Sequence, residues 1–183
     1  MPIYASSKSA GGNFKPAPAG THAAVCCDVV DLGLLEVTFG GKTKKQHKVN
    51  IVWQIEELRD DGQPFTVRKR YTLSLHEKSA MRKDLESWRG RPFTEEELDK
   101  FDLEKLIGIG CFINVIHKPR PEGGEPWANV TTIMKLAKGM AAPKIENYVR
   151  VCDRPQEDGA QPDAAPPDID TGGMGITDED IPF

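Results

Sequence analysis

The fold of this chain is decided by residues 44–75, KKQHKVNIVWQIEELRDDGQPFTVRKRYTLSL. Apolar and polar side chains alternate on both sides of a turn-forming cluster at residues 60–64, and a period of two predicts strands that are buried on one face. The stretch therefore predicts a β-hairpin. If Glu57 lies opposite Phe65, odd-numbered residues of both strands share the core face and even-numbered residues share the outer face.

Three further strands are predicted outside this hairpin. Residues 21–39 read as one long strand that bends at Gly33, where a glycine is typical of a bulge. Residues 111–117 and 127–136 read as two more strands, separated by a loop rich in Pro and Gly.

Helical signals lie between the third and fourth strands. The apolar period changes to about 3.6 over residues 81–88, and Gly90 stands where a helix would stop. Thr94 with Glu97 three residues later is a capping-box pattern, and residues 102–107 predict another short helix.

This order of elements predicts a mainly β protein with a five-stranded, OB-fold-like barrel and a helical insertion between strands three and four. Small β-rolls and other five-stranded barrels would produce the same order. We expect a flexible arm over residues 1–20, a barrel domain over residues 21–142, and a disordered acidic tail over residues 143–183.

The charge of the chain is unevenly distributed. The 24 Lys and Arg residues and 28 Asp and Glu residues give a net charge of -4. All 24 bases lie at or before Arg154, whereas residues 155–183 contain eight acids, so the preceding part has 20 acids (28 less 8) and a net charge of +4. A basic body suits a polyanion such as nucleic acid.

The outer face of the hairpin is the predicted DNA-binding surface, because it carries bases and amides and no carboxylate until Glu56 near the turn. The alternative is a polar face that is merely solvated. Phe65 at the hairpin and Trp127 after the long loop are the candidates for stacking on bases. The predicted polar contacts are Lys44, Lys48, Asn50, Gln54, Arg68 and Arg70.

The C-terminus carries the sharpest motif. The chain ends in GGMGITDEDIPF, with the acids Asp178, Glu179 and Asp180 directly before Ile181, Pro182 and Phe183. A terminal aromatic ring with a free carboxylate and flanking acids fits an apolar pocket ringed by Arg or Lys on a partner.

This ending resembles the acidic tip of bacterial single-stranded DNA-binding proteins, which ends in several Asp residues followed by Ile-Pro-Phe. The resemblance implies that the tip docks on a helicase, primase, polymerase subunit or nuclease during replication, recombination or repair. The architecture of the body is similar to OB-fold single-stranded DNA-binding proteins of bacteriophages. The helical insertion departs from the bacterial family, so the resemblance does not imply the tetramer of that family. Whether the chain forms a homo-oligomer is left open by the sequence.

Other functions have weaker signals. Four cysteines and four histidines are dispersed without metal-ligand spacing, so we expect a non-enzymatic protein without cofactor or metal. No stretch is long and apolar enough to span a membrane, and we expect a cytoplasmic location. A recombination mediator or strand-annealing protein, or a protein adaptor whose barrel binds protein, is the alternative.

Overall fold

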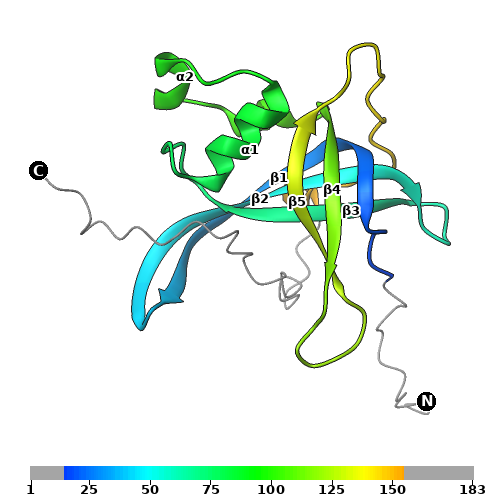
Figure 1. Cartoon of the computed structure of the whole chain (residues 1–183), viewed down its shortest axis with the longest axis horizontal. Coiled ribbons are helices and arrows are strands. Elements are labelled where there is room, and N and C mark those ends of the chain that lie inside the picture. The colour runs from blue at the N-terminus through cyan, green and yellow to red at the C-terminus, as the bar shows by residue number, and fades with distance from the viewer. Residues whose placement is uncertain (1–14, 155–183) are drawn as a thin grey trace, which may run out of the picture.

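The structure is a computed structural model that describes residues 15–154, and its main feature is a single antiparallel sheet (Figure 1). The predicted order of strands and helices is confirmed. The elements are β1 (Gly20–Phe39), β2 (Lys42–Leu58), β3 (Pro64–Thr72), α1 (Ala80–Arg89), α2 (Glu95–Asp99), the 3-10 turn η1 (Leu103–Leu106), β4 (Gly110–Lys118), β5 (Trp127–Lys135) and the 3-10 turn η2 (Val151–Asp153).

The long strand β1 lies in the middle of the sheet, whose strand order is β3-β2-β1-β4-β5. Its first residues pair with β4, and most of its length pairs with β2. The predicted irregularity at Gly33 is confirmed, with a left-handed φ of 68°, and a second one between Cys26 and Asp28 was not predicted. Bulges bend a strand and increase its twist. β1 can therefore pair with β4 at its start and with β2 along the rest of a curled sheet.

The register of the β2–β3 hairpin agrees with the prediction only beside the turn. Leu58 lies opposite Pro64, as the predicted register requires, but the pairing then shifts by two residues, so that Trp53 lies opposite Val67. The register that would place Glu57 opposite Phe65 is therefore not kept beyond the turn. Since a shift of two preserves the alternation of side chains, the predicted division into core and outer faces holds.

The core lies between the concave face of the sheet and α1. Trp53 and Tyr71 point into it, as predicted, and the Trp53 ring lies 5.9 Å from that of Trp88 on α1. Leu73, predicted for the apolar face, is instead 41% exposed because β3 ends at Thr72. Other fully buried side chains are Ile51, Ile55, Met81, Leu85, Ile113, Val115, Val130 and Ile133.

The two edges of the sheet are bridged by side chains. Lys69 of β3 donates to Asp84 of α1 (2.6 Å) and to the carbonyl of Thr131 on β5 (3.3 Å). The Ser87 hydroxyl of α1 donates to the carbonyl of Ile133 on β5 (2.6 Å). These donors satisfy backbone acceptors that an edge strand would otherwise expose. Lys69 thus links β3 to β5, and Ser87 fixes α1 on β5.

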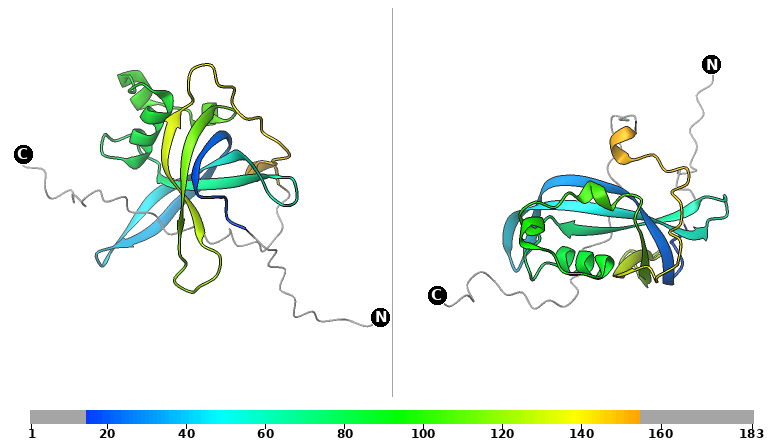
Figure 2. Two further views of the ribbon diagram at one scale, coloured as in Figure 1. Left: turned by 45° about the vertical axis from the view of Figure 1, so that its right-hand side comes forward. Right: turned by 90° about the horizontal axis from the view of Figure 1, so that it is seen from above.

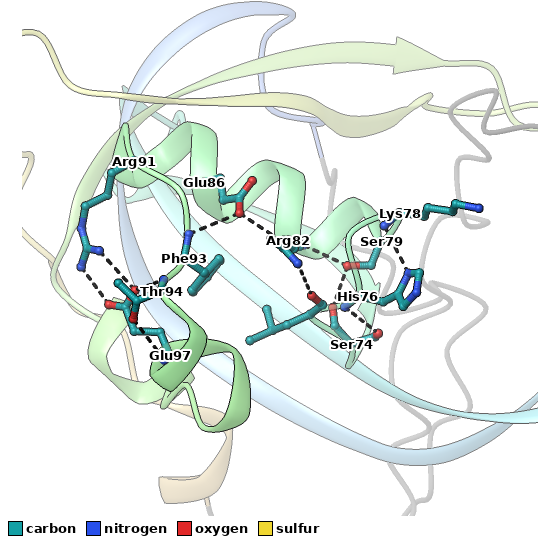
Figure 3. Close-up of polar contacts among 11 residues, drawn as sticks. Ser74, His76, Lys78, Ser79, Arg82, Glu86, Arg91, Phe93, Thr94 and Glu97 are labelled. Carbon is teal, nitrogen blue, oxygen red and sulfur yellow. Dashed lines mark hydrogen bonds and ion pairs between the residues drawn. The ribbon is translucent and has the colours of Figure 1, made fainter.

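Side-chain caps fix where α1 begins and how it connects to α2 (Figure 3). The Ser79 hydroxyl accepts from the Arg82 amide (3.2 Å) and caps the helix, and Arg82 donates to Glu86 one turn later (3.0 Å). The Glu86 carboxylate also accepts from the Phe93 amide (3.3 Å). One carboxylate thus links α1 to the chain that leads into α2.

The predicted helix signals are confirmed. Gly90, with φ of 69°, ends α1 by donating its amide to Glu86. Thr94 and Glu97 form the capping box of α2, and Glu97 also accepts from Arg91 (2.8 Å). The predicted helix over residues 102–107 is a 3-10 turn rather than an α-helix.

Segments outside the strands are also packed on the sheet. Ala17 is buried in the core, and its carbonyl lies 2.7 Å from His117 Nε2. Residues 143–154, predicted to belong to the tail, contact the outer face of β1 and β2 through backbone hydrogen bonds with the side chains of Gln54 and Asp28. Over residues 15–154, no helix is long and apolar enough to cross a membrane.

Candidate nucleic-acid interface

The even-numbered residues of β2 and β3 gather on the outer face, as predicted. Asn50 lies opposite Arg70, and Lys48 lies opposite Thr72 and donates to its hydroxyl (2.9 Å). Arg68 is on the same face of β3 as Arg70 and is half-buried like it. The structure therefore brings four of the predicted DNA contacts together: Lys48, Asn50, Arg68 and Arg70.

Two polar atoms of this group have no hydrogen-bond partner. Asn50 Oδ1 and Arg70 Nε are both buried and unpaired, although the residues face each other across the β2–β3 ladder. Buried polar atoms are nearly always paired in folded proteins, and leaving one unpaired costs about 1–3 kcal/mol. Asn50 and Arg70 are therefore a candidate polar contact for a ligand on the outer face.

The predicted contact Gln54 is used within the protein. Its side-chain amide donates to the carbonyl of Glu146 (2.8 Å) and accepts from the amide of the same residue (2.9 Å). Gln54 is 4% exposed. The outer face is thus covered at this end by a segment that lies about 90 residues further along the chain.

The two aromatic candidates differ in position. Phe65 is 8% exposed and belongs to the hydrophobic core, so its ring presents no face for stacking in this conformation. Trp127 is half-buried at the start of β5, opposite Lys118, and the Arg120 guanidinium lies 5.5 Å from its ring centroid. Trp127 remains the stacking candidate, and Arg120 is a neighbouring cation that the sequence prediction missed.

Lys44 lies on a protruding arm. The ends of β1 and β2 continue beyond the body as a two-stranded ribbon, which we call the basic arm and define as residues 34–48. The arm and the β4–β5 loop both extend from the lower end of the body in Figure 1 and in the left view of Figure 2. Lys42, Lys44 and Lys45 are all exposed on the arm, and the run KTKK could have identified the two that were not predicted.

The described residues provide little for covalent or metal chemistry. Cys26, Cys27 and Cys111 are buried, and this burial raises the pKa of all three thiols. A buried thiol with a raised pKa is a poor nucleophile. Between residues 15 and 154, no group of three or more His, Cys, Asp or Glu side chains could hold a metal ion.

The fourth cysteine provides a test of this arrangement. Cys152 is exposed, so we expect a thiol reagent to modify one cysteine per chain rapidly in the native protein and all four after denaturation. Absorbance of the released thiolate measures the stoichiometry. A Cys152→Ser variant should show no rapid phase, and a second rapid equivalent in the native protein would contradict the burial of the other three.

The predicted partner-binding tip, residues 178–183, lies outside the described residues. Comparison of the whole chain with protein-family models and with curated proteins finds no match.

Proposed function

We propose that this chain binds single-stranded DNA, with little sequence preference, through an OB-like barrel and recruits partner proteins through its C-terminal tip. The strand order supports the barrel, because β3 and β5 are the edges that closure would join. The Lys69 side chain bridges these edges, and Ser87 of α1 donates to β5 beside it. Helix α1 of the helical insertion packs against both of these edge strands.

The observation that carries DNA binding is the facing pair of Asn50 and Arg70, each with an unpaired polar atom, between Lys48 and Arg68. The half-buried Arg68 and Arg70 can follow a phosphate backbone. Lys48 and Asn50 are each 6% exposed, so they can contact a phosphate, sugar or base only after the outer face opens. Asp60 and Asp61 lie at the β2–β3 turn. A strand would therefore span the outer face from the Gln54 end to the basic arm and Trp127, and it would stop short of these carboxylates.

Tryptophan fluorescence tests the proposal directly. Trp53 and Trp88 are buried, so Trp127 is the tryptophan that a ligand can reach. We expect oligo-dT to quench the fluorescence, to bind more tightly than the matching duplex, and to bind less tightly at higher salt. A Trp127→Phe variant should lose the quenching. Absence of binding to oligo-dT by the wild-type protein, measured also by anisotropy of labelled DNA, would refute the proposal.

The tip has a separate role in this proposal. Deleting residues 178–183 should preserve or tighten binding to oligo-dT, because it removes three acids and the terminal Phe but no base. It should abolish binding to a helicase or nuclease that docks the acidic tips of bacterial single-stranded DNA-binding proteins. Isothermal titration measures both affinities.

The matched control for this deletion removes six residues from the same tail, 160–165, and leaves the tip intact. This variant should bind the partner like the wild type. Loss of oligo-dT binding on deletion of the tip, or equal partner binding by both deletions, would contradict the separation of roles.

A further inference from the structure

Residues 144–154, which we call the strap, cross the outer face of β1 and β2. The right view of Figure 2 shows η2, which lies within the strap, on the opposite side of the sheet from α1. The middle of β2 is consequently enclosed on both faces, by the core on one side and by the strap on the other.

The main anchor of the strap is the carboxylate of Asp28, which is 1% exposed at the unpredicted bulge of β1. It accepts from the backbone amides of Val29 (2.9 Å) and Val151 (2.8 Å). It also accepts from the Tyr148 hydroxyl (3.2 Å) and Arg150 Nε (3.1 Å). Three of these four donors belong to the strap, so the buried charge depends on the strap for its partners.

The remaining contacts of the strap are also polar. Arg150 reaches Glu104 with a second nitrogen (2.6 Å), and the backbone of Glu146 bonds twice to Gln54. Apolar burial contributes little, because Ile145, Val149 and Val151 are 38%, 55% and 43% exposed. Water can replace the donors that the strap gives to Asp28, and phosphate can replace the carboxylates that pair with Arg150. A segment held by buried apolar groups would have no such substitute.

We propose that the strap is an autoinhibitory cover, which closes the Gln54 end of the outer face in the free protein and is released when a single strand occupies that face. Asn50 and Gln54 lie on the same face of β2, so a strand that extends from Asn50 along β2 meets the strap at Gln54. The inference rests on the proposed function. Closure raises the apparent Kd for DNA, because only the open fraction of the molecules can bind.

The test compares two single substitutions in the full-length protein. Arg150→Gln removes an anchor to the sheet and to η1. Arg154→Gln removes the same charge from the same segment, but Arg154 contacts Val149 and Tyr148 within the strap itself. Relative to Arg154→Gln, Arg150→Gln should bind a long oligo-dT about tenfold more tightly, as expected when the open state changes from minor to dominant.

Hydrogen exchange reports the state of the strap without relying on affinity. The amides of Glu146 and Val151 donate to Gln54 and Asp28, so they should exchange faster in Arg150→Gln, and faster in the wild type when oligo-dT is bound. Tyr148→Phe provides a second weakened anchor, should Arg150→Gln fail to fold.

The outcomes separate the two proposals. If no variant binds oligo-dT, the proposed function and the inference both fall. If the wild type binds oligo-dT while the Glu146 and Val151 amides stay protected, or if Arg150→Gln and Arg154→Gln bind equally, only the inference falls.

Discussion

Substituting Glu for both Arg68 and Arg70 is expected to weaken binding to oligo-dT by on the order of a hundredfold at low salt. Both guanidinium groups lie on the outer face of β3, and Arg70 faces Asn50 across the ladder. Each phosphate contact on a single strand contributes about 0.7 to the slope of log affinity against log salt, so losing two should reduce the slope by about 1.4. Titrations at several salt concentrations measure both quantities.

A matched control distinguishes local contacts from the net charge of the protein. Lys83 on α1 and Lys100 after α2 are exposed on the helical insertion rather than on the outer face. Changing both to Glu alters the net charge by the same amount, and it should reduce affinity much less than the arginine variant at the same salt concentration, because charges remote from the bound strand are screened. An unchanged salt slope in the arginine variant, or an equal loss in both variants, would remove the hairpin face from the proposed site.

The features that sequence predicted correctly are those with local causes. Alternation predicted the hairpin, a left-handed glycine ended α1, and Thr94 with Glu97 formed the predicted capping box. The assignment of core and outer faces also held, because the register shifted by two residues and not by one. Phe65 follows the same rule. Its odd number places it with Val67 on the core face, and its position near the turn does not expose it.

The covering of the outer face was not predictable from local patterns. The segment over residues 143–154 has no apolar period, and its contacts join it to residues about 90 to 120 positions earlier. Asp28 looks like an ordinary polar residue of a strand until the bulge turns its carboxylate toward the strap. Long-range polar pairing of this kind leaves no periodic signal in the sequence, and for this reason Gln54 was predicted to be available.

Substituting Ala for Trp88 should have the largest effect on stability. The side chain is 2% exposed, its ring packs on Trp53 of β2, and its Nε1 donates to the carbonyl of Gly110 on β4 (3.0 Å). It therefore joins α1 to two strands that flank β1. Removing a buried aromatic ring typically costs about 3–5 kcal/mol, which corresponds to a decrease in Tm of roughly 10 °C for a protein of this size.

Two further variants identify the cause of this loss. Trp88→Phe keeps most of the ring and removes the hydrogen bond to Gly110, so it should cost about 1–2 kcal/mol. Glu95→Ala changes an exposed residue of α2 and should be within about 0.5 kcal/mol of the wild type. If thermal unfolding followed by circular dichroism gives Trp88→Ala the same Tm as Glu95→Ala, α1 is not part of the cooperative unit. Because Trp88 is remote from the outer face, the folded Trp88→Ala protein should bind oligo-dT as the wild type does at low temperature, whereas a parallel loss of binding would mean that α1 also shapes the outer face.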